Sequence, residues 1–300
     1  MATLTFYDDP RDFLARADGH LRRNPVLNTV VATYTERLAA EIEDGVYEAE
    51  VDHPRWWLVV TDAAGEVVGA AMRTAPFRPH PPFLLAMPDE AAVELARVLH
   101  ERGEPMAGIN GALPGARLCA EESARLSGGT PEVAIHTRLF ELEELIPPRP
   151  VDGALRLATP DDAELALTWF HEFLLAADEQ AGRAPGSAHD QVETIEGILR
   201  RIELERLWFW TDGSGERVHM TGANPPAYGA ARVGPVYTPV EHRGHGYASA
   251  AVAEVSRRIL AHDSRPCLFT DQANPTSNAI YLALGYRPVV DMVNMLIQPR

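Results

Sequence analysis

The chain contains no lysine and only two cysteines, Cys119 and Cys267. Both cysteines fall in segments expected to form regular structure, so buried free thiols are favoured over a disulfide. No His and Cys residues have the spacing of a zinc site, and no metal is expected. No apolar run reaches the length of a membrane span, and residues 1–10 are acidic, unlike the start of a secretory signal. We therefore expect a cytoplasmic protein with no membrane partner.

Positive charge is also scarce, because 27 arginines face 43 acidic residues and leave a net charge of −16. Binding to nucleic acid needs a basic patch for the phosphates, so nucleic acid is not an expected partner. An acidic surface attracts a cationic amine, although it also simply keeps a protein soluble. At 300 residues the chain is long enough for about two domains. The sequence leaves open whether the protein is a monomer or a homodimer.

The most informative stretch is Val233–Ser249, in which a β-branched segment ends at Thr238-Pro239 and is followed by Arg243-Gly244-His245-Gly246-Tyr247-Ala248. After this loop, apolar residues recur at helical spacing. The pattern predicts a strand, a glycine loop and a helix. The first N–H groups of a helix are unpaired and carry partial positive charge, and glycine lets a ligand approach the backbone. Such a loop is a cradle for a pyrophosphate.

The loop resembles the acyl-CoA pyrophosphate loop of the GNAT N-acetyltransferase superfamily, whose general form is Gln/Arg-x-x-Gly-x-Gly/Ala. Glu241 departs from this form at the first position. A second segment, Asn274 to Tyr281 followed by Leu284-Gly285-Tyr286, is similar to the family's Asn-x-x-Ala/Ser-x-x-x-Tyr…Gly-Phe/Tyr pattern. The two segments together support the resemblance much more than the glycine loop does alone.

A dinucleotide-binding loop is the competing interpretation. Gly244–Ser249 nearly matches G-x-G-x-x-G/A, and Asp271 follows at about the distance of a ribose-binding acid. However, a turn separates the strand from Gly244, and the preceding residues predict a hairpin rather than a parallel βαβ unit. The segment from Asn274 to Tyr281 also has no role in a dinucleotide fold. A NAD-type oxidoreductase is therefore only an alternative.

The resemblance implies an N-acetyltransferase that uses acetyl-CoA as co-substrate and transfers the acetyl group to an amine of a small molecule by direct attack. It also implies a bulged strand that separates from its neighbour to admit the pantetheine arm, and Gly234-Pro235 fits such a break. A non-catalytic protein that binds acyl-CoA as a sensor or scaffold is a further alternative. The cofactor-binding residues implied are Val236, Tyr237, Thr238, Arg243, Gly244, His245, Gly246, Tyr247, Ala248, Asn274, Ser277 and Asn278.

Two catalytic residues are expected. Tyr281 matches the family's tyrosine, which protonates the departing thiolate. The general base is less defined, because the central strand 230–238 has no carboxylate. Glu172 is preferred as the base because it shares a predicted helix with the apolar Trp169 and Phe173. The other candidates considered are His171, Asp178, Glu179 and His219.

The element order repeats, which predicts two tandem GNAT-like domains of α/β (α+β) class, each a mixed, mostly antiparallel sheet flanked by helices. The proline-rich residues 146–152 are the expected linker between a domain over 1–145 and a catalytic, acetyl-CoA-binding domain over 153–300. In the first half, Pro88-Asp89-Glu90-Ala91 stands where the glycine loop would be, and its two carboxylates would repel a pyrophosphate. The first domain is therefore expected to be a degenerate copy. A first helix is expected to start at Asn24-Pro25, and the substrate pocket is expected to use the loops 181–188 and 222–228.

Overall fold

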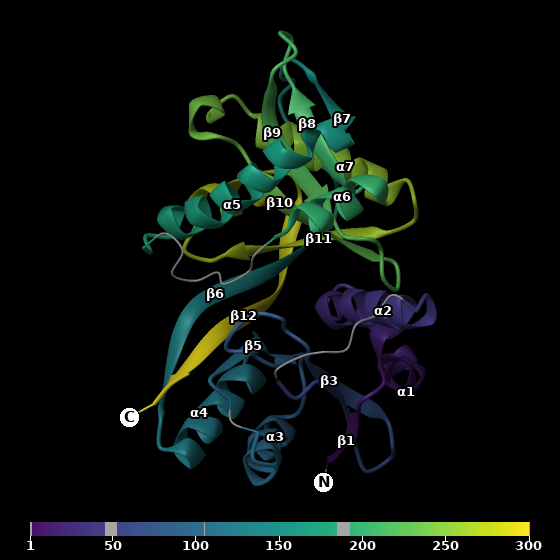
Figure 1. Ribbon diagram of the computed structural model, residues 1–300, viewed down its shortest axis with the longest axis vertical. Coiled ribbons are helices and arrows are strands. Elements are labelled where there is room, and N and C mark those ends of the chain that lie inside the picture. The colour runs from purple at the N-terminus through teal and green to yellow at the C-terminus, as the bar shows by residue number, and fades with distance from the viewer. Residues whose placement is uncertain (1, 46–52, 105, 185–192, 300) are drawn as a thin grey trace. The chain divides into compact units, whose positions relative to one another are not determined.

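The computed structural model describes residues 2–45, 53–104, 106–184 and 193–299. The chain forms two compact units. Unit 1 contains Met1–Thr137 and Val290–Arg300, and unit 2 contains Arg138–Val289. The fold is mixed α/β, as expected, with eight helices and mostly antiparallel strand pairs among the described residues (Figure 1).

The units do not divide at the proline-rich segment. The chain passes from unit 1 to unit 2 within β6 (Thr130–Leu142) and returns within β12 (Tyr286–Gln298). Each of these strands has 13 residues, well above the usual strand length, so one strand supplies pairing groups to both units. The segment 146–152 lies inside unit 2, where the carbonyl of Asp152 accepts a hydrogen bond from Trp210 Nε1 at 2.8 Å.

In unit 1 the strands are hydrogen-bonded in the order β1-β2-β3-β4-β5-β12, followed by the first part of β6. Neighbouring side chains of β2 point to opposite faces, as strand geometry requires. Trp56 packs in the core with α3 and α4, whereas Trp57 Nε1 donates to Thr35 Oγ1 of α2 at 2.9 Å. Helices therefore cover both faces. The remaining bounds are β1 Thr3–Tyr7, α1 Pro10–Arg23, α2 Thr29–Glu43, β2 Trp56–Thr61, β3 Val67–Arg73, β4 Phe83–Leu84, α3 Asp89–Glu101, β5 Gly108–Ala112 and α4 Gly115–Ser127.

The expected helix start at Asn24-Pro25 is wrong. Asn24 is the residue after α1, and α2 begins only at Thr29. The signal that starts α1 lies earlier, where the Asp9 carboxylate accepts from Arg11 N at 2.8 Å and Pro10 occupies the first helical position.

In unit 2 the order is β6-β11-β10-β9-β8-β7. Strand β8 is apolar on both faces: Leu207 and Phe209 pack against α5 and α6, while Trp208 and Trp210 belong to the clusters that contain α7. These aromatic residues belong to the hydrophobic core of unit 2. The bounds are β7 Ala154–Leu157, α5 Ala163–Gln180, α6 Ile195–Glu203, β8 Leu207–Thr211, β9 Arg217–Ala223, β10 Ala230–Tyr237, α7 Tyr247–Leu260, β11 Arg265–Asp271 and α8 Pro275–Ala283.

The start of α5 is fixed by a capping box of Thr159 and Asp162. Asp162 is buried and also pairs with Arg156 at 2.7 Å and Arg217 at 2.6 Å. Although burial alone would raise the pKa of the Asp162 carboxyl, these hydrogen bonds hold it well below its usual value. This carboxylate joins β7, β9 and the first turn before α5.

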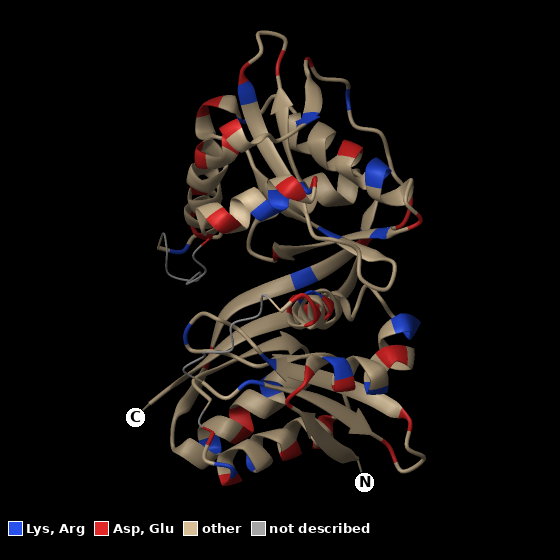
Figure 2. Ribbon diagram, turned by 45° about the vertical axis from the view of Figure 1, so that its right-hand side comes forward, with Lys and Arg blue, Asp and Glu red and all other residues tan. Residues whose placement is uncertain are grey.

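Cys119 and Cys267 are buried thiols outside any disulfide, as expected. Within the described ranges, none of the helices combines the length and the apolar character needed to span a bilayer. Figure 2 shows acidic and basic residues interspersed over the helices of each unit. Neighbouring helices therefore form pairs such as Arg97 Nε of α3 with Glu122 Oε1 of α4, at 2.7 Å.

Candidate functional site

Strands β10 and β11 separate along their length. They pair in parallel only from Ala230 to Arg232, opposite Arg265 to Cys267. On the other side of β10, the register with β9 shifts between Val233 and Val236, as expected for a bulge at Gly234-Pro235. From Val233 onward, the edge of β10 that faces β11 has no partner strand in the described pairing. Strand β10 therefore continues through Val236 and Tyr237 paired with β9 alone in the described pairing, and the edge toward β11 is where an extended ligand would lie.

The glycine loop lies directly after this opening. Gly244 and Gly246 have φ angles of +82° and +88°, a region that side chains rarely adopt. Gly246 is the residue before α7, and no side chain caps the helix there. Residues 244–246 are exposed, and a Cβ on Gly244 would meet no protein atom within 4 Å. The first N–H groups of α7, at Tyr247 and Ala248, have no acceptor within the helix and no side-chain cap, and an anion fits such a helix start.

The loop is braced against the sheet. Arg243 Nε donates to the carbonyl oxygen of Thr238 at 3.1 Å. The hydroxyl of Thr238 lies 2.7 Å from His219 Nδ1, and His219 Nε2 lies 2.5 Å from the Thr221 hydroxyl. His219 is fully buried, and burial lowers its pKa to about 3, so the imidazole is neutral and braces β10 rather than acting as a solvent-accessible base.

Helix α8 begins on the second predicted segment. Asn274 Oδ1 accepts from Ser277 N at 3.0 Å, so Asn274 caps the helix. Asn278 Nδ2 donates to the carbonyl oxygens of Asp271 and Asn274 at 2.9 and 2.6 Å. The amides therefore hold the turn from β11 into α8, and the side chain of Ser277 lies on the first turn of α8.

Tyr281 is the one buried residue of α8 in the described chain, at 7% exposure. Its ring makes an edge contact with Tyr286, with centroids 6.0 Å apart, and packs in a cluster with Val233 of β10 and Leu268 of β11. No described residue hydrogen-bonds to its hydroxyl. Burial raises the pKa of Tyr281, so the hydroxyl stays protonated at neutral pH.

Glu172 is exposed on α5 and accepts a hydrogen bond from the Tyr237 hydroxyl at 2.9 Å. Burial, followed by this bond, raises the pKa of Tyr237 to about 12. The pair places the preferred base candidate at the end of β10, where the opening lies. His171, by contrast, is exposed and its Nε2 lies 3.3 Å from the carbonyl oxygen of Glu193.

The end of α5 is tied to β11 by contacts that no sequence motif indicated. Arg183 pairs with the buried Asp178 at 3.2 Å and with Asp271 at 2.6 Å. Asn274 Nδ2 also donates to Gln180 Oε1 at 2.9 Å. These contacts hold the end of α5 beside the opening. Asp178 is therefore an ion-pair partner rather than a free base. Of the expected substrate loop 181–188, residues 185–188 lie outside the described residues.

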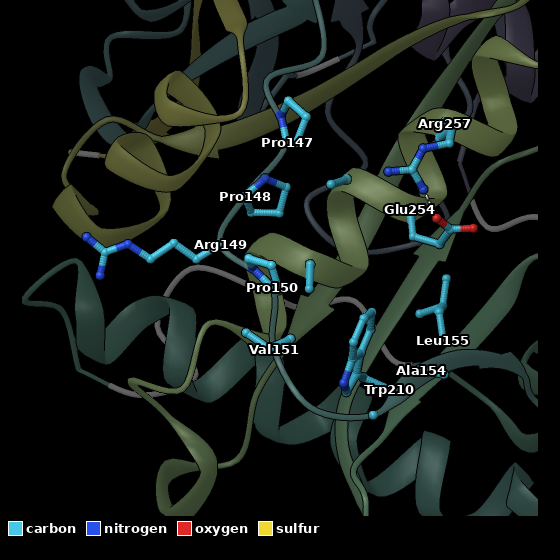
Figure 3. A pocket seen from close by; sticks show the side chains of 13 residues that line it. Pro147, Pro148, Arg149, Pro150, Val151, Ala154, Leu155, Trp210, Glu254 and Arg257 are labelled. Atoms are coloured by element: carbon cyan, nitrogen blue, oxygen red, sulfur yellow. Dashed lines mark ion pairs between the residues drawn. The ribbon is translucent and has the colours of Figure 1, made fainter.

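A hollow of about 410 Å³ in unit 2 is lined by residues 147–151 and 153–155, by Trp210 of β8 and by four residues of α7, Ala250, Ala253, Glu254 and Arg257. Figure 3 shows Pro147, Pro148 and Pro150 along one side of it, and Glu254 and Arg257 of α7, which form an ion pair, along another. Val151 Cγ1 is 3.0 Å from the position of a Cβ on Gly246. The segment 146–152 thus supports the N-terminus of α7 as a packed wall.

The corresponding turn of unit 1 differs. Helix α3 follows Pro88, whose side chain makes no cap, and Asp89 and Glu90 occupy its first turn. Two carboxylates at a helix N-terminus interact favourably with the helix dipole and oppose a bound anion. The anion cradle of α7 is therefore not repeated at α3.

Residues 224–293 match the sequence model of a family described as FR47-like protein. Among solved structures, a GCN5-related N-acetyltransferase from Sphaerobacter thermophilus is 16% identical, with a TM-score of 0.56 and coverage of 99% of this chain and 96% of that chain. A GNAT-family acetyltransferase from Colwellia psychrerythraea is 12% identical, with a TM-score of 0.53 and 99% of both chains covered.

A tandem GNAT protein from the clavulanic acid biosynthesis pathway is 14% identical, with a TM-score of 0.50 and coverage of 99% of this chain and 98% of that chain. A comparison with curated proteins found no match. At these identities the likeness shows the fold. The expected fold is thereby confirmed: the chain has the GNAT fold of these structures, and its residues 224–293 match the FR47-like sequence model.

Proposed function

We propose that this protein transfers an acetyl group from acetyl-CoA to an amine of a small molecule, and that unit 2 carries the reaction. The observation that carries the proposal is the uncapped, glycine-lined N-terminus of α7 at the open end of the gap between β10 and β11. A pyrophosphate fits the N-terminus of α7, and an extended thiol arm fits the gap between β10 and β11. Acetyl-CoA, when bound, supplies the activated acetyl group.

The residues of unit 2 divide the remaining tasks. The N–H groups of residues 244–248 hold the anion, and Arg243, fixed on the Thr238 carbonyl, keeps the loop against β10. Val236, Tyr237 and Thr238 provide the strand backbone along the arm. Asn274, Ser277 and Asn278 shape the far wall at the start of α8.

Two proton transfers complete the direct attack. Glu172 accepts a proton from the attacking amine, through water, because the carboxylate is exposed and lies at the end of β10. Tyr281 donates its hydroxyl proton to the departing thiolate. The phenol suits this role because burial keeps it protonated and no described residue occupies it. Holding the reactants in this geometry lowers the entropic part of the barrier.

The proposed function is tested by incubating the protein with acetyl-CoA and a panel of small amines. Turnover is measured as the release of free CoA thiol. Both protein thiols are buried, so a thiol reagent reads the released CoA with little background. Amine-dependent release supports the proposal. Binding of acetyl-CoA without any amine-dependent release would instead identify a non-catalytic acyl-CoA-binding protein. A NAD-type site is disfavoured, because β8, β9 and β10 form an antiparallel meander.

Glu172→Gln is expected to lower turnover roughly tenfold near neutral pH, less than for a buried general base, because bulk water partly replaces an exposed one. The measurement is kcat with saturating acetyl-CoA, together with its pH profile. Glu179→Gln is the matched control, since Glu179 is exposed on the same helix. Equal rates for both variants would remove Glu172 from the mechanism.

CoA is expected to bind once per chain, in unit 2. The reason is the contrast between Gly244 and Gly246 before α7 and Asp89 and Glu90 at the start of α3. Titration calorimetry with CoA measures the number of sites directly. A stoichiometry of two, or protection of residues 86–92 from hydrogen exchange when CoA is added, would contradict this expectation.

A further inference from the structure

Helix α5 crosses the gap between β10 and β11 on the face of the unit 2 sheet opposite α7. Its contacts move from strand to strand along the helix. The ring centroid of Trp169 lies 5.4 Å from that of Phe209 in β8 and 6.0 Å from that of Tyr237 in β10. One turn later, Glu172 accepts a hydrogen bond from the Tyr237 hydroxyl at 2.9 Å. The first half of α5 is therefore attached to β10 at the end where the gap opens.

The far end of α5 is attached to β11 instead. Arg183, three residues after the helix, donates from Nε to Asp178 Oδ1 at 3.2 Å, and its Nη2 lies 2.6 Å from Oδ2 of Asp271, the last residue of β11. Asn274 Nδ2 donates to Gln180 Oε1 at 2.9 Å. Asp178 is fully buried and Asp271 is 13% exposed, so water and salt screen these charges less than they screen a surface ion pair.

The attachment points are far apart on α5. Glu172 and Gln180 are eight residues apart in the helix, which is about 12 Å along its axis at roughly 1.5 Å per residue. Two paired strands lie only about 4.8 Å apart. In the described pairing, β10 and β11 pair no further than Arg232 and Cys267. Helix α5 is therefore a spacer between two strand ends that do not pair with each other.

We propose that Arg183 and Gln180 are positioning residues for acetyl-CoA, because their bonds to the end of β11 hold the gap open before the ligand binds. The proposal rests on the proposed function, in which the pantetheine arm occupies the gap. An unpaired strand edge exposes N–H and C=O groups that favour pairing with another strand. Without the spacer, the arm would have to order both strand ends as it enters, and that ordering costs binding free energy.

The experiment compares two ligands by calorimetry on the full chain. CoA has both the pyrophosphate and the arm, whereas adenosine 3′-phosphate 5′-diphosphate has the pyrophosphate but lacks the arm. Arg183→Met keeps the apolar stem of the side chain and removes the guanidinium. We expect this variant to weaken CoA binding at least roughly tenfold, since the arm must then order the gap. Binding of the arm-free ligand should stay unchanged, because the helix start of α7 is not altered.

Arg201→Met is the matched control. Arg201 of α6 has a side-chain exposure of 28%, against 21% for Arg183, and pairs with Glu193 at 3.1 Å. It should leave the binding of both ligands unchanged. Gln180→Met removes only the bond from Asn274 and keeps the ion pairs of Arg183. We expect it to weaken CoA binding about threefold, because one neutral hydrogen bond is weaker than an ion pair with a buried carboxylate.

Melting temperatures report whether each variant is folded. Unchanged or tighter CoA binding in Arg183→Met, or an equal loss for both ligands, would overturn the proposal. If Arg183→Met does not fold, Gln180→Met decides by the same comparison, and unchanged CoA binding in that variant overturns the proposal. Absence of CoA binding to the wild-type chain is a different outcome, since it removes the proposed function itself and this inference with it.

Discussion

Replacing Gly244 by valine is expected to abolish acetyl-CoA binding, with at least a ~100-fold loss of affinity, or about 2.7 kcal/mol. Gly244 has a φ of +82°, and a Cβ placed on it would lie more than 4 Å from every residue other than its chain neighbours. A valine side chain would therefore stand where the pyrophosphate must approach the N–H groups of α7. The folded protein has room for the side chain, so the loss appears in binding. Calorimetry with acetyl-CoA and with CoA measures it.

The matched control is Gly215→Val. Gly215 has a φ of +90° in the hairpin turn between β8 and β9, and a Cβ there also meets no atom within 4 Å. Valine at Gly215 has the same backbone strain as valine at Gly244, about 1–2 kcal/mol, but lies away from the expected ligand. Gly246→Val is a less clean variant, because its Cβ would contact Val151 at 3.0 Å. If Gly244→Val binds acetyl-CoA as tightly as Gly215→Val does, the loop is not the pyrophosphate site.

Tyr281→Phe is expected to lower turnover at least tenfold. General acid catalysis contributes at least ~10²-fold to a rate, so the loss is expected to approach that factor. The substitution keeps the ring in its buried cluster and removes only the hydroxyl. Because no described residue bonds to that hydroxyl, its loss leaves no protein partner unsatisfied. Binding of acetyl-CoA and the melting temperature should therefore stay close to wild type, while kcat falls under conditions in which the chemical step limits the rate.

Tyr286→Phe makes the same change in the neighbouring ring. The Tyr286 hydroxyl lies 2.7 Å from Ser256 Oγ in the core, so its removal is expected to cost about 1 kcal/mol of stability and no turnover. The two variants thus separate a chemical role from a packing role. If Tyr281→Phe keeps the wild-type rate, Tyr281 only packs, and water protonates the thiolate.

Local chemistry made much of unit 2 predictable. Thr159 and Asp162 form a capping box, and Asn274 caps α8. Each of these signals depends on residues three apart in the chain, so the sequence alone contains the whole interaction. The same holds for the glycine loop, where a left-handed backbone at Gly244 and Gly246 follows from the residue type.

The site was predicted less completely, because its side chains come from distant parts of the chain. Glu172 reaches Tyr237 across 65 residues, and Arg183 reaches Asp271 from the end of α5. His219 was considered as a base, yet it is sealed between Thr221 and Thr238. Burial of His219 depends on packing against α7 and β10. The residue pattern of β9 alone does not show which elements cover that strand in the folded protein.

The sequence by itself was enough to recognise the fold and the glycine loop. It was also enough to show that unit 1 has Asp89-Glu90 in place of that loop. Each of these conclusions depends on residues that are neighbours in the chain. Only the tertiary structure decided where the units divide. The prolines of 146–152 predicted a linker, but the long strands β6 and β12 each continue from one unit into the other. Strand pairing is a long-range interaction, so the partner of each half of these strands is set by the folded sheet and not by the strand's own residues.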